Sequence, residues 1–225
     1  MHSPRSKHHQ TGFTLVEIAI VLVIIGLLLG GILKGQEMIT QARIKNVAND
    51  FNGITAAYFS YQDRYKAVPG DDGAANPRWA AAKNGGGNGA LGGLYNATFP
   101  GDPVGMTVDN TSNESLNFWW HLRLAGFVAG PTSGAGSASP PSNAVGGIVG
   151  AQSAGMGLPG NIICSSNIPD KIAVAVDNQL DDQRSNGGNM RGQLQTTSSP
   201  IIGPGSGEAN YLETGSNQYL ICRSI

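Results

Sequence analysis

Charged residues make up only 13% of the 225-residue chain, and the formal net charge is −1. A protein that binds nucleic acid without sequence preference needs a basic surface to neutralise phosphates. This balance provides none, so we expect no nucleic-acid partner. Histidine is scarce too, and His121 is the only one beyond residue 9. Neither a nucleophile elbow nor a partner at metal-ligand spacing accompanies it, so we expect a structural histidine, no enzyme activity and no cofactor.

Regular hydrophobic periodicity is missing from residues 68–113, which are rich in Gly, Asn, Pro and Asp. We expect a loop there, with one helical turn near residues 79–83. Residues 87–92 formally match the glycine fingerprint of dinucleotide-binding proteins, but no strand signal precedes them and no βαβ pattern surrounds them. A flexible surface loop is the better prediction. Residues 128–160 are a second tract of low complexity, for which we expect a long loop or an inserted flap.

The sequence does contain one long apolar run. Between Gly12 and Leu33 the only charge is the carboxylate of Glu17. About 20 such residues, as a helix, span the hydrocarbon core of a bilayer. An acidic group deep in lipid costs on the order of a few kcal/mol, so Glu17 needs either a partner or a hydrated position near the interface. Residues 1–12 carry basic side chains and no acid, which predicts a cytoplasmic location for this end.

An ordinary secretory signal has its cleavage site after the apolar stretch, whereas the candidate glycine, Gly12, precedes it. The apolar segment should therefore remain in the mature protein. A short basic leader, the sequence Gly-Phe-Thr-Leu-Val-Glu at residues 12–17 and an unbroken apolar helix occur together here. This combination resembles the class III leader of type IV pilins and type II secretion pseudopilins.

The resemblance implies that a prepilin peptidase cuts between Gly12 and Phe13 and N-methylates Phe13, and that Glu17 is the assembly carboxylate. The physical chemistry agrees. A glycine lets the backbone extend into a protease cleft without a Cβ in the way. The freed Phe13 amine is a cation that can neutralise the Glu17 carboxylate of a neighbouring subunit in lipid.

Three regions follow from the resemblance: a leader at residues 1–12, a transmembrane and assembly helix at 13–34, and a periplasmic pilin-like domain at 35–225. The implied location is the inner membrane, crossed once, and afterwards a pilus or pseudopilus in the periplasm or at the cell surface. The implied partners are other pilin subunits through the N-terminal helix, the prepilin peptidase, the inner-membrane assembly platform and the membrane itself.

The implied function is that of a minor pilin or pseudopilin. A major pilin is one alternative, and a binding module carried on the filament, an adhesin or a DNA-uptake pilin, is another. An exposed aromatic or basic cluster would favour the binding module, and the candidates are Arg78, Trp79 and Lys83. An anchored periplasmic enzyme would need a convergent polar site that the sequence does not display.

The fold class that we predict is α+β, with one long N-terminal helix packed on a C-terminal antiparallel sheet. The helix should run from Phe13 to about Arg64, because apolar residues recur every three or four positions from Ile44 to Tyr65. A second helix is predicted at 114–126, capped by Ser112 or Asn113. Strand signals stand at 161–164, 171–176, 192–196 and 218–222, and residues 177–189 resemble a hairpin connection between two of these strands.

Cys164 and Cys222 are the only cysteines, and each lies in a predicted strand. The export implied by the leader would place them in an oxidising compartment, and many type IV pilins tie their C-terminal region with one bridge. We expect a disulfide between them, the alternative being two buried thiols.

Calcium stabilises some pseudopilins, and the only candidate ligands here are Asp177, Asp181 and Asp182. An EF-hand would need Gly in place of Asp182 and Glu in place of Gly188. Aspartates also cap turns routinely. We therefore expect no metal.

Overall fold

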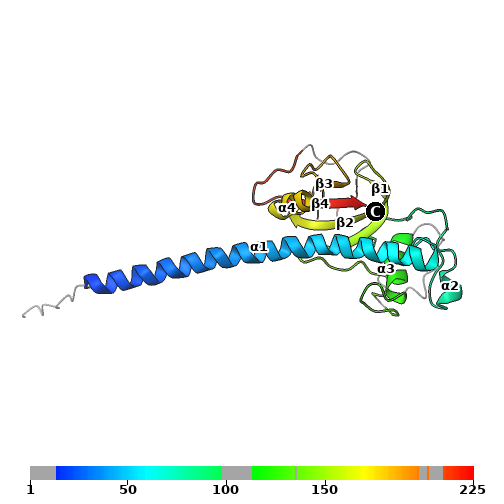
Figure 1. Cartoon of the computed structure of the whole chain (residues 1–225), viewed down its shortest axis with the longest axis horizontal. Coiled ribbons are helices and arrows are strands. Elements are labelled where there is room, and N and C mark those ends of the chain that lie inside the picture. Colours follow the sequence, from blue (N-terminus) through cyan, green and yellow to red (C-terminus); the bar gives the residue numbers. More distant parts are fainter. Residues whose placement is uncertain (1–13, 98–112, 135, 198–201, 203–209) are drawn as a thin grey trace, which may run out of the picture. The chain divides into compact units, whose positions relative to one another are not determined.

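The structure is a computed structural model that describes residues 14–97, 113–134, 136–197, 202 and 210–225. It divides into two compact units, Met1–Ala42 and Arg43–Ile225. The fold is α+β, as predicted, with a long apolar helix at the N-terminal end and an antiparallel sheet in the C-terminal part (Figure 1). Gly12 and Phe13, the predicted cleavage residues, lie outside the described residues.

Helix α1 (Leu15–Tyr65) has 51 residues and belongs to both units. Within the first unit, every side chain from Leu15 to Leu33 is exposed. By length and composition, α1 is the one helix of the described chain that could cross a membrane. Isoleucine, valine and leucine supply most of this surface, which water would not solvate favourably.

The second half of α1 lies in the second unit and buries one stripe of side chains, while the opposite face is exposed. The predicted periodicity is confirmed. The apolar residues that recur every three or four positions from Ile44 to Tyr61 are buried, and Tyr65 is half-buried. The helix ends after Tyr65, where Lys66 has a left-handed backbone with φ of 54°. Pro69 follows and cannot donate a helical hydrogen bond.

The sheet consists of β1 (Val149–Gly155), β2 (Leu158–Pro169), β3 (Met190–Leu194) and β4 (Gln218–Ser224), in the order β1-β2-β4-β3 with all neighbours antiparallel. Because side chains alternate along a strand, each strand supplies both faces. Ile163 and Ile221 share a core with the buried stripe of α1, and Figure 1 shows the sheet beside this half of the helix. Ile162 and Leu220 belong to a second core that includes Tyr95. Both faces of the sheet are therefore covered.

The predicted strand at 171–176 is wrong, because these residues lie in helix α4 (Asp170–Leu180). Their alternating valines suggested a strand, yet Ile172, Ala173 and Val176 lie on one helical face and are buried in the main core. Tertiary burial here outweighs the β propensity of valine. The predicted hairpin at 177–189 is wrong for the same reason, since it contains the end of α4 and the connection to β3.

The low-complexity tract at 128–160 is also not a single loop, because β1 and the start of β2 lie inside it. Its small residues are needed for close packing: a Cβ on Gly150 would collide with the carbonyl of Tyr95. The helical turn predicted at 79–83 is found slightly earlier, as α2 (Ala75–Arg78). The predicted helix at 114–126 is α3 (Glu114–Leu124), and Gly126 follows it with φ of 78°.

Candidate functional site

Glu17, the predicted assembly carboxylate, lies in the first turn of α1, where it forms a capping box with Thr14. The backbone N–H and the hydroxyl of Thr14 each donate to Glu17 Oε2 at 2.8 Å, and the Glu17 N–H donates to Thr14 Oγ1 at 3.3 Å. This arrangement satisfies N–H groups that the start of a helix leaves free. It also holds a carboxylate beside the chain that leads to Phe13. The sequence signal, Thr followed three residues later by Glu, was present but missed.

The two cysteines form a disulfide, as predicted, and the alternative of two free thiols is wrong. Cys164 in β2 and Cys222 in β4 are direct partners across the antiparallel pair, with Cα atoms 4.0 Å apart. Both are fully buried in the second core. The bond ties the final strand to the sheet and closes a segment of 58 residues.

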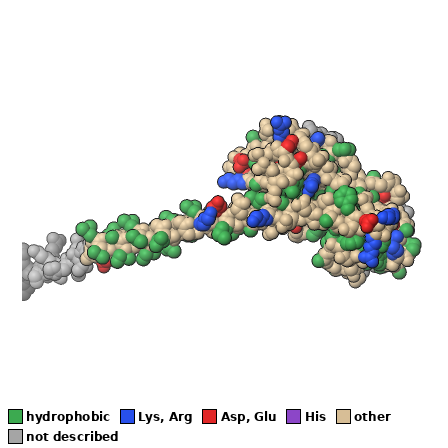
Figure 2. Space-filling model, viewed as in Figure 1, with side chains coloured by type: hydrophobic (Ala, Val, Ile, Leu, Met, Phe, Trp, Pro, Cys, Tyr) green, Lys and Arg blue, Asp and Glu red, His purple; other side chains and the backbone are tan. Residues whose placement is uncertain are grey.

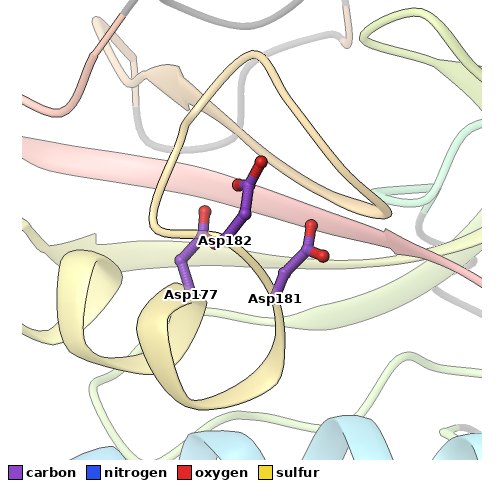
Figure 3. A group of neighbouring side chains, drawn as sticks. All are labelled: Asp177, Asp181 and Asp182. Carbon is purple, nitrogen blue, oxygen red and sulfur yellow. The ribbon is translucent and has the colours of Figure 1, made fainter.

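The three aspartates that were the calcium candidates do converge (Figure 3). Asp177 lies in the last turn of α4, and Asp181 and Asp182 follow the end of the helix, so that one oxygen of each carboxylate lies within 4.8 Å of the others. All three already accept hydrogen bonds. Met190 N–H donates to Asp181 at 2.8 Å and Arg184 N–H donates to Asp182 at 2.9 Å. The carboxylates thus fasten the connection between α4 and β3.

Asp177 is fully buried and accepts from the Gln183 N–H at 2.9 Å and from the Tyr211 hydroxyl at 2.6 Å. Burial raises the pKa of Asp177 to about 6, and the neighbouring charges of Asp181 and Asp182 act in the same direction. The proton that this site favours relieves the same repulsion that a bound cation would relieve.

Helix α3 is buried on all sides, and its polar side chains hold three separate loops. His121 is fully buried: its Nδ1 accepts from the Gly70 N–H at 2.9 Å, and its Nε2 lies 2.8 Å from the Lys83 carbonyl. The Arg123 guanidinium donates to three carbonyls between Gly136 and Ser139. Burial lowers the pKa of His121 to about 4. This environment supports the predicted structural role.

The first turn of α3 differs from the prediction, because the Asn113 side chain forms no cap hydrogen bond. Ser112 lies outside the described residues. The Glu114 carboxylate instead accepts the N–H groups of Gly86 and Gly92, each at 2.7 Å. Burial raises the pKa of Glu114.

The glycine loop with the fingerprint-like sequence also surrounds a carboxylate. Asp71 is 3% exposed and accepts N–H groups from Gly87, Asn88 and Gly89 at 2.6, 3.2 and 2.5 Å. Successive N–H groups of this kind form an anion-binding nest. Here the anion is a side chain of the protein, so the loop, which lies at the surface as predicted, is held at its base by Asp71.

The candidates for a binding cluster, Arg78, Trp79 and Lys83, are only partly brought together. Arg78 lies over the Trp79 ring, 5.4 Å from its centroid, and over the Tyr65 ring at 4.7 Å. The backbone carbonyl of Lys83 contributes to the loop held by His121. Sequence reasoning missed Tyr65 because its place in the apolar stripe marked it as a core residue.

One family model, described as the prokaryotic N-terminal methylation motif, matches residues 7–33. A search of curated proteins and a search of solved structures found no match. The matched segment contains Gly12, Phe13 and Glu17 and the whole apolar run up to Leu33. The chain thus carries the prokaryotic N-terminal methylation motif, which is the signature of type IV pilins and pseudopilins.

Proposed function

We propose that this protein is a minor pilin or pseudopilin: a membrane-inserted subunit that is cleaved, N-methylated and stacked into a type IV pilus or type II secretion pseudopilus. The observation that carries the proposal is the methylation motif at residues 7–33, continued by a helix whose apolar side chains are exposed up to Leu33. A surface of this kind needs lipid or other apolar helices around it. A filament core built from such helices provides the second environment.

The proposed layout is a cytoplasmic leader at residues 1–12, a membrane and assembly helix at 13–34 and a periplasmic domain at 35–225. The disulfide supports this layout, because disulfides persist in oxidising compartments. The leader is removed by prepilin peptidase, and the inner-membrane assembly platform passes the mature subunit to the filament.

The proposed roles of the site residues rest on charge. Cleavage after Gly12 creates an amine on Phe13, and Glu17 of a neighbouring subunit supplies the opposite charge. In a medium of low dielectric constant, an unpaired carboxylate is much more costly than one that is paired with a cation. The capping box with Thr14 holds the carboxylate until the neighbouring amine arrives.

A minor or initiating role suits the large, loop-rich second unit better than a role as the repeating subunit. Glycine contributes 33 residues and proline 12, and long loops surround α3. Such loops tolerate insertion and carry specific contacts, which suits a subunit present in few copies. The choice between a pilus and a secretion pseudopilus requires a genetic test: deletion of the gene, with piliation, twitching, protein secretion and DNA uptake measured side by side.

The test of the proposal uses Gly12→Val, which places a branched side chain before the scissile bond. We expect an uncleaved membrane protein that is absent from sheared filaments. Thr11→Val, one residue earlier, is the matched control and should be cleaved and incorporated normally. Normal incorporation of Gly12→Val would contradict the proposal.

A further inference from the structure

Four asparagines of the chain are each followed directly by glycine: Asn52, Asn84, Asn88 and Asn186. In such a pair, the backbone nitrogen of the glycine can attack the side-chain amide carbon of the asparagine. Glycine favours this attack because it has no Cβ to hinder the approach and because its backbone rotates freely. The attack requires an asparagine amide and a glycine nitrogen that are not held in other hydrogen bonds. These two requirements distinguish the four pairs.

Asn52 lies inside helix α1 and meets neither requirement. Its Oδ1 accepts a hydrogen bond from Arg223 Nη1 at 2.8 Å. Gly53 also lies in the interior of α1, where each N–H donates to the carbonyl four residues earlier. The helix therefore holds the Gly53 nitrogen away from the Asn52 amide.

Asn84 lies in the glycine loop and is likewise held at both reacting groups. Its Oδ1 accepts from the Asn76 N–H at 2.8 Å, and the Gly85 N–H donates to the Asp72 carbonyl at 2.9 Å. Both hydrogen bonds must open before the Gly85 nitrogen can reach the Asn84 amide carbon. The folded structure should therefore protect this pair.

Asn88, in the same loop, is held in a similar way. Its Oδ1 accepts from the Ala90 N–H at 2.8 Å, and the Gly89 N–H donates to the Asp71 carboxylate at 2.5 Å. A hydrogen bond to a carboxylate is stronger than one to a neutral acceptor. The Gly89 nitrogen is thus held firmly, and this pair should be protected too.

Asn186 is the exception among the four. It is exposed in the connection between α4 and β3, and its side chain forms no hydrogen bond within the part of the chain that the structure describes. The Gly187 N–H donates to the Arg184 carbonyl at 3.2 Å, which is longer than the bonds of the two loop glycines. Gly188 follows with φ of 54°, and two successive glycines allow the backbone rotation that the attack needs.

We infer that Asn186 is a site of spontaneous deamidation in the folded protein and that the other three asparagines are protected. The Gly187 nitrogen forms a bond to Asn186 Cγ as the bond from Cγ to Nδ2 breaks. Nδ2 leaves as ammonia and takes the proton that the Gly187 nitrogen gives up. Water then opens the succinimide ring at either carbonyl, which produces aspartate or isoaspartate. Water is the only co-reactant of the two steps.

The product adds a carboxylate to a part of the loop that already packs on two. A Cβ on Gly187 would lie 2.7 Å from Asp182 Oδ2, and one on Gly188 would collide with the Asp181 carboxylate. Figure 2 shows a mostly uncharged surface on the second unit, with acidic and basic side chains in small groups. One added negative charge takes the formal net charge of the chain from −1 to −2. Because like charges repel at short range, deamidation should destabilise the connection between α4 and β3.

The experiment is peptide mapping by mass spectrometry of the full-length chain, after incubation in detergent micelles at mildly alkaline pH. Trypsin cleaves after Arg184 and Arg191, so Asn186 falls in a different peptide from the other three pairs. Deamidation replaces an amino group with a hydroxyl group and changes the peptide mass by that difference. We expect Asn186 to react at least about tenfold faster than Asn84 or Asn88, because two hydrogen bonds protect each of these.

The same chain unfolded in guanidinium chloride is the matched control, because it keeps the sequence and loses the hydrogen bonds. All four pairs should then react at similar rates. Asn186→Ser removes the reacting amide and should abolish the mass change in its peptide. Fragment spectra distinguish Asn186 from Asn189, which lies in the same peptide.

Faster reaction at Asn186 in the folded chain, together with similar rates at all four pairs in the unfolded chain, supports the inference. Equal rates at the four pairs in the folded chain would overturn it. A rate at Asn186 that folding lowers as strongly as it lowers the rates at Asn84 and Asn88 would also overturn it. None of these outcomes bears on cleavage at Gly12, so the two proposals fail separately.

Discussion

The two halves of α1 belong to one helix but differ in how their apolar side chains are covered. From Leu15 to Leu33 the helix is apolar on every face apart from Glu17, and all of its side chains are exposed, whereas from Ile44 to Tyr61 one stripe is buried and the remaining face is exposed. The first half depends on surroundings outside the chain, and the second half completes its packing within the chain. Mutations in the first half should therefore affect insertion and assembly, and mutations in the second should affect folding.

The largest expected effect is on assembly. Glu17→Ala should still insert and be cleaved but should be absent from filaments, because an unpaired Phe13 amine would remain in an apolar core. Glu17→Gln, which keeps the shape of the side chain but not its charge, should fail likewise. Sheared-filament immunoblots with the membrane fraction as reference measure this. Normal incorporation of either variant would refute charge pairing.

The second-largest expected effect is the loss of stability on removing the disulfide, and it is confined to the second unit. In the chain-entropy model, closing 58 residues contributes about 4 kcal/mol to the free energy of unfolding. Replacing both Cys164 and Cys222 with alanine should therefore lower that free energy by about 4 kcal/mol. Denaturant unfolding followed by tryptophan fluorescence tests this, because all three tryptophans lie in the second unit. An unchanged unfolding midpoint would contradict it.

A matched pair of variants compares the two halves of α1 directly. Phe51→Ala removes a side chain that is 1% exposed and should lower the free energy of unfolding by at least about 3 kcal/mol. Leu27→Ala, at a side chain that is 72% exposed, should change it by less than about 0.5 kcal/mol. The same fluorescence measurement serves for both. Equal losses would show that the two halves do not differ in the way described.

His121 and Asp177, two groups of the second unit, should make the stability of the protein depend on pH. Burial holds His121 neutral, with a pKa of about 4 against 6.5 in an unfolded chain, so stability should fall as the pH drops from about 6.5 to about 4. His121→Gln retains a donor and an acceptor but does not titrate, and it should remove that acid sensitivity. The variant must be compared with wild type across the pH range, since its stability at neutral pH can differ for other reasons. An unaltered pH slope would exclude His121 as its source.

Asp177 should act in the opposite direction. Its pKa of about 6 exceeds the ordinary value of 3.8, so the folded protein binds the extra proton and stability should fall as the pH rises from about 3.8 to about 6. Asp177→Asn should remove this loss while keeping an acceptor for the Gln183 N–H. Melting curves of the variant and the wild type at several pH values measure the difference. If the stability of Asp177→Asn fell with rising pH as steeply as that of the wild type, Asp177 would not be the source of the effect.

The smallest expected effect is that of calcium. Because every aspartate of the cluster already accepts a hydrogen bond, we expect millimolar calcium and chelator to leave the melting temperature unchanged. A calcium-dependent rise that Asp181→Asn abolishes would contradict this expectation and assign the cluster a cation.

Short-range patterns predicted the elements that depend on a single helix or strand. The stripe of α1 has a clear period, and the segments containing Cys164 and Cys222 read as strands. The strand β1 could not be predicted in the same way, because its sequence Val-Gly-Ala-Gln-Ser-Ala-Gly is rich in small residues, of which Gly150 is required by the close approach of the Tyr95 backbone. Helix α4 was missed because alternating valines resemble a strand until the burial of Ile172, Ala173 and Val176 is known.

The site residues also differ in whether a local sequence pattern predicts them. Gly12, Phe13 and Glu17 are contiguous in a motif, so the sequence was enough to single them out. Asp71 and His121 form hydrogen bonds with residues that are 16 and 51 positions away in the sequence, respectively. No local sequence pattern predicts such pairs. Tyr65 has two roles, closing the buried stripe and supporting two guanidinium groups, and only the first is visible in a hydrophobic period.

The most direct test of the central claim is the intact mass of the protein purified from the membranes of cells that contain prepilin peptidase. We expect a chain that begins at Phe13 and carries one additional methyl group at its N-terminus. In cells that lack the peptidase, the leader should remain. A mature chain that begins beyond Leu33, or one that retains residues 1–12 in the presence of the peptidase, would contradict it.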